Sequence, residues 1–259
     1  MPGSFDFSLA ASRPHARWRR HLTLWASLAA LLSGGAAFAQ ADVNFTIWKP
    51  NLDEFAAVDQ KRRPEQGGVL FVGSSTIRLW RNLAQDFRQQ PVVINRGFGG
   101  STLAACNFFA KELVLQYRPA QVLVYAGDND LAMGRTPAQV FETFVRFTST
   151  VRAELPNARI AYISIKPSPQ RAALMPSIRQ TNQLIADYLG KLQNADYIDI
   201  HTAMLTDTGQ PRPELFLADM LHMNAQGYAL WQSIISPYLA ASAAVPPVAP
   251  LAVAVPGIK

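Results

Sequence analysis

The chain is organised around residues 69–76, which read Val-Leu-Phe-Val-Gly-Ser-Ser-Thr. An unbroken apolar run of this length is typical of a buried parallel strand. Ser74 and Ser75 come directly after it, at the carboxyl end where open α/β sheets place their ligands. We therefore expect a strand that presents a serine at the rim of a sheet, and we expect Ser75 to be a nucleophile.

Further strand patterns follow, and helical patterns separate them. The expected strands cover residues 92–95, 122–126, 159–165 and 197–200. The expected helices lie near residues 76–88, 103–117, 137–153, 174–192 and 225–239. This alternation predicts an α/β fold, in which a parallel sheet carries helices on both faces.

The N-terminus has the three parts of a secretory signal. Arg17-Trp18-Arg19-Arg20 is the positive region, residues 22–32 are the apolar region, and Ala37-Phe38-Ala39 is the small-x-small cleavage pattern. We expect residues 1–39 to be a signal peptide and the protein to be secreted or periplasmic. An uncleaved membrane anchor is the alternative, although the apolar region is short for a membrane-spanning helix.

The rest of the chain divides by composition into three parts. Residues 40–66 are expected to form an N-terminal extension with one helix, near residues 50–62. Residues 67–240 carry the alternating pattern and form the predicted catalytic domain. Residues 241–259 are rich in Ala, Pro and Val, with almost no charge, and we expect a tail without fixed structure.

Charge and cysteine content argue against several classes of protein. The net charge is +6, and it falls to +3 without the four arginines and one aspartate of residues 1–39. That excess is too mild to indicate a nucleic-acid partner. Cys106 is the only cysteine in the sequence, so no disulfide forms within the chain. After residue 39 the histidines are His201 and His222, too few with one cysteine for a structural zinc site; we expect no metal and no cofactor.

A nucleophilic serine needs a base, and His222 is the main candidate. Asp219 precedes it by three residues, so the carboxylate can fold back onto Nδ1–H and leave Nε2 free to face a serine. His201 is the competitor, because Asp199 lies two residues before it at the end of a strand. We favour a loop-edge role for His201.

Two strand ends offer hydrogen-bond donors for an oxyanion. One is the glycine-rich segment 95–102, whose backbone N–H groups can approach a ligand closely. The other is Gly127-Asp128-Asn129-Asp130, where Asn129 can donate its side-chain amide. Ordinary turn formation is the alternative explanation for each segment alone.

Taken together, these segments resemble the SGNH (GDSL-type) hydrolases, a family of serine esterases and lipases. The resemblance covers about residues 67–240. It implies a flavodoxin-like three-layer sandwich with a five-stranded parallel sheet. It also implies a triad of Ser75, His222 and Asp219, and an oxyanion hole formed by the backbone N–H groups of Ser75 and Gly100 and the side chain of Asn129.

The sequence departs from the family pattern at two positions that bear on the site. Ser74 stands where the family usually has Asp, so two serines compete as nucleophile, and register favours Ser75. Asp128 stands where Gly is common, and we expect its side chain to point away from the oxyanion site, into the turn.

The predicted function is a carboxylic ester hydrolase acting on short acyl or acetyl esters, such as acetylated carbohydrates. The alternatives are an acyltransferase to a sugar or lipid hydroxyl, a lysophospholipase or thioesterase, and a non-catalytic binding module. Substrate-binding residues are not identified by any motif, and Arg96 and Lys166 are candidates because they follow or end strands. We expect a small-molecule or carbohydrate ester as partner, and no stable membrane anchor after signal cleavage.

Overall fold

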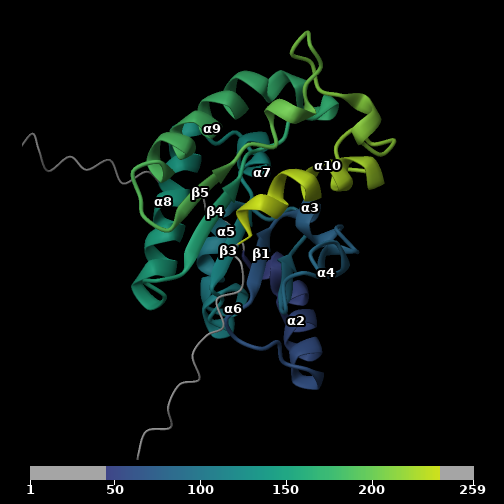
Figure 1. Cartoon of the computed structure of the whole chain (residues 1–259). Coiled ribbons are helices and arrows are strands. Elements are labelled where there is room, and N and C mark those ends of the chain that lie inside the picture. Colours follow the sequence, from purple (N-terminus) through teal and green to yellow (C-terminus); the bar gives the residue numbers. More distant parts are fainter. Residues whose placement is uncertain (1–44, 240–259) are drawn as a thin grey trace, which may run out of the picture. The chain divides into compact units, whose positions relative to one another are not determined.

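The computed structural model describes residues 45–239. Their centre is a five-stranded parallel sheet in the order β2-β1-β3-β4-β5 (Figure 1). The strands are β1 (Val69–Gly73), β2 (Val93–Gly97), β3 (Gln121–Tyr125), β4 (Arg159–Ile163) and β5 (Ala195–Ile198). This is the flavodoxin-like order, with β1 and β3 flanking the point where the connections reverse direction. The predicted fold class is confirmed.

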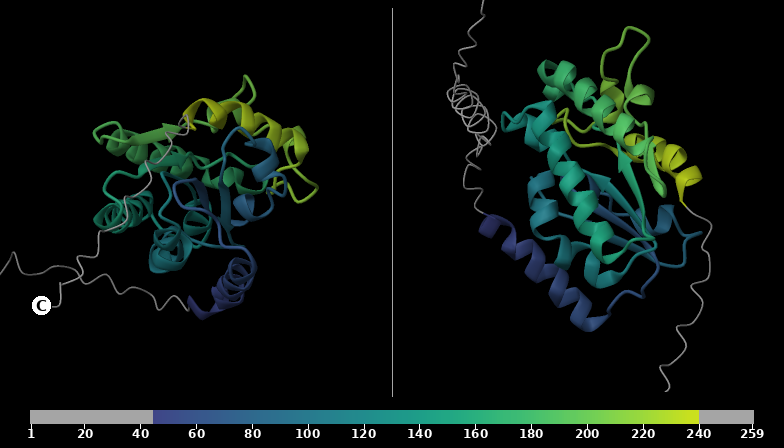
Figure 2. Two further views of the ribbon diagram at one scale, coloured as in Figure 1. Left: turned by 60° about the horizontal axis from the view of Figure 1, so that its bottom comes forward. Right: turned by 90° about the vertical axis from the view of Figure 1, so that its left-hand side faces the viewer.

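Helices cover both faces of the sheet (Figure 2). On one face, Phe144 packs edge-on against Tyr162 of β4. On the other, Trp231 packs against Tyr125 of β3. The main covering helices are α5 (Leu103–Phe108), α8 (Pro137–Glu154), α9 (Met175–Leu189) and α10 (Ala225–Ile235). Alternate residues of each strand therefore enter different cores, which explains why the central strand β1 is apolar and buried at every position.

Two long helices expected from the sequence are broken in the structure. The region 76–88 forms two single turns, α3 (Ser75–Arg78) and α4 (Leu83–Asp86). Between them the buried indole of Trp80 packs at a tilt against the ring of Phe87, and its Nε1–H donates to Asp86 at 2.6 Å. Burial of this large ring against the sheet outweighs continuation of the helix. The region 103–117 likewise divides into α5, α6 (Ala110–Leu113) and the 3-10 turn η2 (Leu115–Tyr117).

Strand ends also differ by a few residues from the expected ones. β4 ends at Ile163. Beyond it, the backbone of Ile165 is bound by the side chain of Asn182. The Ile165 N–H donates to Oδ1 of Asn182 at 2.8 Å, and Nδ2 of Asn182 donates to the Ile165 carbonyl oxygen at 3.0 Å. The Asn182 side chain thus makes the two hydrogen bonds that a neighbouring strand would otherwise make to this backbone. The short helix α7 (Asp128–Ala132) follows β3 after two intervening residues and is not among the helices predicted from the sequence.

The N-terminal segment consists of the 3-10 turn η1 (Phe45–Trp48) and helix α2 (Lys49–Lys61). Pro50 occupies the first turn of α2, where its missing N–H costs nothing. The predicted signal peptide and the predicted tail lie outside the described residues. Within residues 45–239, no helix is both long enough and apolar enough to span a membrane.

Candidate active site

Ser75 stands at a sharp junction between strand and helix. Gly73 ends β1 with φ +145°, and a Cβ there would lie 1.8 Å from the carbonyl oxygen of Tyr125. Only glycine fits such a close approach of two strands. Ser74 then donates its backbone N–H to that same oxygen at 3.0 Å, and Ser75 becomes the first residue of α3. As the first helical residue, its N–H has no acceptor within the helix.

The hydroxyl of Ser75 lies in a continuous hydrogen-bonded line with His222 and Asp219. Ser75 Oγ is 3.0 Å from Nε2 of His222, and Nδ1 of His222 is 2.6 Å from Oδ2 of Asp219. The other carboxylate oxygen of Asp219 accepts the backbone N–H groups of Leu221 and His222, at 3.0 and 2.9 Å. The short 219–222 loop thus fixes the carboxylate against its own backbone, and the carboxylate fixes the ring.

Solvent reaches this line from the aspartate end. The side chain of Asp219 is 47% exposed and that of His222 is 25% exposed. Partial burial acts to raise the pKa of Asp219, but the hydrogen bonds from His222 and Leu221 outweigh it and lower that pKa to about 2. The carboxylate is therefore ionised over the whole neutral range, which keeps the Nδ1 proton of His222 in place.

Neither of the two competing residues belongs to the hydrogen-bonded line of Ser75, His222 and Asp219. The hydroxyl of Ser74 is buried, and among the described residues it has no hydrogen-bond partner. His201 lies in the loop after β5, as expected, but it is buried there, and its Nδ1 lies 3.0 Å from the carbonyl oxygen of Ile165. Burial lowers the pKa of His201, so the ring is neutral.

Three strand ends bring the predicted oxyanion donors to one rim. Gly73, Gly97 and Tyr125 pair across β1, β2 and β3, so these strands end at the same level. Phe98 N–H donates to the Gly73 carbonyl at 2.9 Å, which fastens the glycine-rich loop to the end of β1. The loop then turns through Gly100, whose φ is +67°.

Asn129 reaches the same loop from the end of β3. Its Nδ2 donates to the carbonyl oxygen of Ser101 at 2.9 Å, and its Oδ1 accepts from Nη2 of Arg171 at 2.8 Å. If the amide were flipped, its NH₂ would face the NH₂ of Arg171 and its oxygen would face the carbonyl oxygen of Ser101. These two partners therefore fix the orientation of the amide. The second proton on Nδ2 has no acceptor among residues 45–239.

Behind Asn129 lies a buried charge cluster that consists of Asp128, Lys166 and Arg171. Oδ2 of Asp128 is 3.0 Å from Nη1 of Arg171 and 3.4 Å from Nζ of Lys166. Burial acts to raise the pKa of Asp128, but the two cations outweigh it and the pKa is lowered. The expectation that Asp128 points away into the turn is wrong. Its Oδ1 does accept the Asn129 N–H, at 2.9 Å, but the side chain enters the protein because two cations compensate it there.

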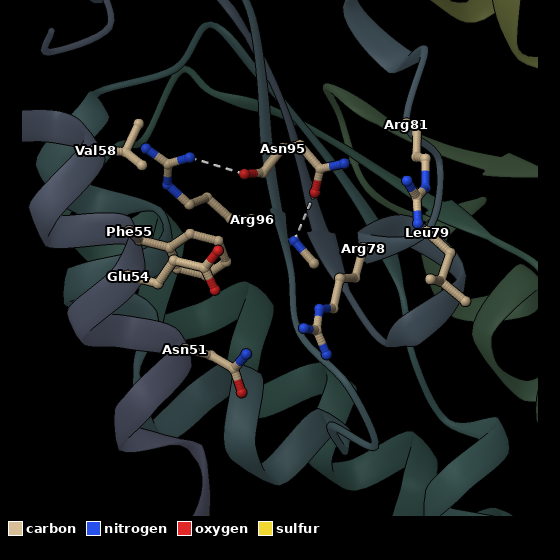
Figure 3. Close-up of a pocket in the computed structure, with 10 residues that line it drawn as sticks. Asn51, Glu54, Phe55, Val58, Arg78, Leu79, Arg81, Asn95 and Arg96 are labelled. Carbon is tan, nitrogen blue, oxygen red and sulfur yellow. Dashed lines mark hydrogen bonds between the residues drawn. The ribbon is translucent and has the colours of Figure 1, made fainter.

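The two candidate substrate-binding residues are both held within the protein. Lys166 is 2% exposed, and its Nζ lies 3.0 Å from the hydroxyl of Tyr125. Arg96 lines a cavity of about 560 Å³ between α2 and α3 (Figure 3), but it donates to Asp59, Tyr117 and the carbonyl oxygen of Asn95. Arg78 and Arg81, from the other wall of this cavity, are exposed.

Arg171 is the contributor that sequence reasoning missed. It belongs to the 3-10 turn η3 (Pro169–Leu174), 42 residues away from Asn129. No spacing pattern connects the two, and the nearest predicted residue is Lys166, which lies five residues before Arg171 in the sequence. Within residues 45–239, no cluster of three or more His, Cys, Asp or Glu side chains could hold a metal ion.

Comparisons with known proteins agree with this architecture. No curated protein matches the chain. Solved structures of the same fold include a GDSL-like lipase from Bacteroides thetaiotaomicron, with 21% identity and a TM-score of 0.60 over 75% of this chain and 97% of that one. A protein from Streptococcus pneumoniae, named after platelet activating factor, has 18% identity and a TM-score of 0.66 over 74% and 92%. An acetyl-xylooligosaccharide esterase from Geobacillus has 14% identity and a TM-score of 0.55 over 66% and 93%.

The sequence pattern of the GDSL-like Lipase/Acylhydrolase family matches residues 68–230. This range contains Ser75, Gly100, Asn129, Asp219 and His222 and covers more than half of the chain. The chain therefore belongs to the GDSL-like lipase/acylhydrolase family of ester hydrolases.

Proposed function

We propose that this enzyme hydrolyses short-chain acyl esters, acetyl esters in particular, with Ser75 as the nucleophile. The hydrogen-bonded line from Ser75 Oγ through His222 to Asp219 is the observation that carries the proposal. His222 Nε2 takes the hydroxyl proton as Ser75 Oγ attacks the ester carbonyl carbon. It then returns the proton to the leaving alkoxide, and a water that His222 activates hydrolyses the acyl-enzyme.

Negative charge develops on the carbonyl oxygen twice, first when Ser75 attacks the ester and again when water attacks the acyl-enzyme. The backbone N–H groups of Ser75 and Gly100 and the Nδ2–H of Asn129 are its proposed donors. Loss of one such donor costs about 10²–10³ in kcat in a serine hydrolase. We therefore expect the kcat of Asn129→Ala to be lower than that of the wild type by about 10²–10³-fold.

Two observations support a short acyl chain. Beside Asp219, the apolar side chains of Leu217 and Met220 are 48% and 40% exposed, so they do not line an enclosed tunnel. One protein of the same fold is an acetyl-xylooligosaccharide esterase, and another is an acetyl esterase bound to acetate. An acetylated carbohydrate is thus a reasonable substrate class to test.

Substitution of the competing residues tests the nucleophile. On p-nitrophenyl acetate, Ser75→Ala should lower kcat by about 10³-fold or more. Ser74→Ala and His201→Ala should retain activity in their folded fraction, and a fluorophosphonate probe should label all of these proteins except Ser75→Ala. Activity retained in Ser75→Ala, or lost only in Ser74→Ala, would overturn the assignment.

A chain-length series tests the substrate class. The ratio kcat/KM should fall from the acetyl to the octanoyl p-nitrophenyl ester, and acetylated xylose or glucose should release acetate. A preference for the octanoyl ester would contradict the proposal. Product that increases with added acceptor alcohol would instead indicate acyl transfer.

Secretion or export to the periplasm is proposed from the sequence of residues 1–39 alone. Mass spectrometry of the protein recovered from the periplasm or medium should find an N-terminus at Gln40. Recovery only in the membrane fraction with residues 1–39 intact would favour an uncleaved anchor.

A further inference from the structure

The peptide bond that joins Gly99 to Gly100 is held by a residue from the N-terminal segment. The indole Nε1–H of Trp48 donates to the carbonyl oxygen of Gly99 at 3.0 Å. Trp48 is 4% exposed, and its ring meets that of Phe98 edge-on, with centroids 6.0 Å apart. Trp48 therefore contacts the glycine-rich loop by a directional hydrogen bond and by packing.

This hydrogen bond constrains the N–H of Gly100 as well. A trans peptide is planar, and its C=O and N–H point in opposite directions. There is no cis peptide among the described residues. When Trp48 fixes the Gly99 carbonyl on one side, the Gly100 N–H is fixed on the other side. In residues 45–239 that N–H meets no protein acceptor, so it is free for a ligand.

The local sequence cannot hold this peptide in place by itself. Two consecutive glycines place little steric restriction on the rotation of the peptide between them. A Cβ built on Gly100 would have no heavy atom within 4 Å, so neighbouring side chains do not wedge this residue either. A flip would turn the carbonyl oxygen toward the ligand and remove a donor. The hydrogen bond from Trp48 opposes that flip.

The segment that carries Trp48 is anchored at both ends. Before Trp48, the ring of Phe45 stacks on that of Phe108 with centroids 4.1 Å apart. After it, Asp59 of α2 pairs with Arg96 of β2 at 2.6 Å, and both side chains are largely buried. The guanidinium of Arg96 also lies 4.9 Å from the centre of the Phe55 ring. Arg96 thus serves as the anchor of α2 on the sheet.

We propose that Trp48 is a positioning residue for the oxyanion hole, so that the segment 45–61 is a working part of the active site. The inference rests on the proposed function, because it takes the Gly100 N–H as an oxyanion donor. It goes beyond that function, because Trp48 lies outside residues 68–230, where the family pattern matches.

Trp48→Phe is the direct test, since it keeps an aromatic ring and removes only the N–H donor and part of the ring. We expect kcat on p-nitrophenyl acetate to fall about 10-fold, a fraction of the loss for a missing donor, with KM changed less than twofold. Inactivation by the fluorophosphonate should slow by a similar factor, because the phosphonyl oxygen occupies the same hole. All rates are expressed per titratable site at a temperature well below the melting point.

Two comparisons separate positioning from stability. Trp231→Phe makes the same change at a buried indole whose N–H donates to the sulfur of Met204, and it should lose stability but keep kcat per site. A second variant places 3-benzothienylalanine at position 48, which replaces the ring N–H by sulfur in an otherwise isosteric side chain. It should show the same fall in kcat with little change in melting temperature.

The inference is overturned if both the Trp48→Phe and the benzothienyl proteins keep kcat within twofold of the wild type. If Trp48→Phe fails to fold, the isosteric variant decides alone. These outcomes are distinct from failure of the proposed function, which activity in Ser75→Ala would reveal. An inactive Ser75→Ala together with a fully active position-48 variant would remove only the role of Trp48.

Discussion

Nη2 of Arg171 lies 2.8 Å from Oδ1 of Asn129, and Nη1 of the same guanidinium lies 3.0 Å from Oδ2 of Asp128. One planar group thus joins a buried carboxylate to the amide proposed as an oxyanion donor. A cation on the amide oxygen draws electron density from its nitrogen and makes the Nδ2–H a stronger donor. It also keeps the amide from flipping.

Arg171→Met should therefore weaken catalysis through its effect on Asn129, not through a lost contact with the substrate. We expect kcat on a short-chain ester to fall about 10-fold, less than the 10²–10³-fold expected when Asn129 itself is removed. Arg171→Lys should recover part of the loss, since it restores a cation but not the two-pronged geometry. Steady-state kinetics measure this, with exposed Arg179 of α9 changed to Met as the control. Equal kcat for Arg171→Met and wild type would contradict the role.

Asp128 is expected to matter for stability more than either of its partners. Asp128→Asn leaves Lys166 and Arg171 close together without a counterion, and loss of one member of a buried ion pair typically costs about 3–5 kcal/mol. Lys166→Met leaves the Asp128–Arg171 pair intact and should cost less than half as much. Urea denaturation of the two variants gives the comparison, and a greater loss for Lys166→Met would reverse this interpretation.

Much of the fold could be predicted because its signals are local. The buried strand 69–73 is apolar at every position, and Thr136-Pro137 begins α8 with a capping box closed by Gln139. The break after Arg78 could not be predicted, because it depends on the burial of Trp80 against the rings of Tyr228 and Trp231, about 150 residues away in the sequence. Helix ends set by such tertiary packing leave little trace in the local sequence.

The candidate site divides in the same way. Asp219 and His222 lie three residues apart on one loop, so their contact follows from local geometry. The contact of His222 with Ser75 spans 147 residues, so no local pattern predicts it. The expectation came from the need of a nucleophilic serine for a base and from the resemblance to the SGNH hydrolases. Arg171 and Trp48 had no pattern to reveal them, since each acts through one long-range hydrogen bond to a backbone or amide group.

The tautomer of His222 provides a further prediction. In Asp219→Asn, Oδ1 can still accept the N–H groups of Leu221 and His222, so the amide NH₂ would face Nδ1 of the ring. Nδ1 would then act as acceptor and Nε2 would carry the proton, which prevents it from taking the proton of Ser75. We expect kcat to fall about 10²–10⁴-fold.

Asp219→Ala is the informative comparison for that tautomer. It removes the orienting carboxylate, but water can reach Nδ1 because this end of the triad is exposed. The alanine variant should therefore retain at least as much activity as the asparagine variant across a pH–rate profile. If Asp219→Asn is clearly more active than Asp219→Ala, the role of Asp219 does not lie in setting the tautomer of His222.

Asp130 should make the protein less stable as the pH rises. It is 4% exposed, and burial raises its pKa to about 7 although both carboxylate oxygens lie 3.1–3.2 Å from the N–H of Leu103. In the unfolded chain the carboxyl ionises near pH 4. Between about pH 4 and pH 7 the folded state therefore binds more protons than the unfolded state. The free energy of unfolding then decreases as pH increases through this window.

Asp130→Asn removes this titration and keeps an oxygen for the Leu103 N–H. Relative to wild type, the variant should gain about 2–3 kcal/mol in the free energy of unfolding between pH 5 and pH 8, at about 1.4 kcal/mol for each unit of pKa shift. Urea denaturation at the two pH values measures the difference. Asp207→Asn, which changes an exposed carboxylate, is the control and should give no such gain. If the difference in free energy of unfolding between wild type and Asp130→Asn is the same at both pH values, Asp130 is ionised in the folded protein throughout. The hydrogen bond from the N–H of Leu103 would then stabilise the carboxylate more than burial among apolar groups destabilises it.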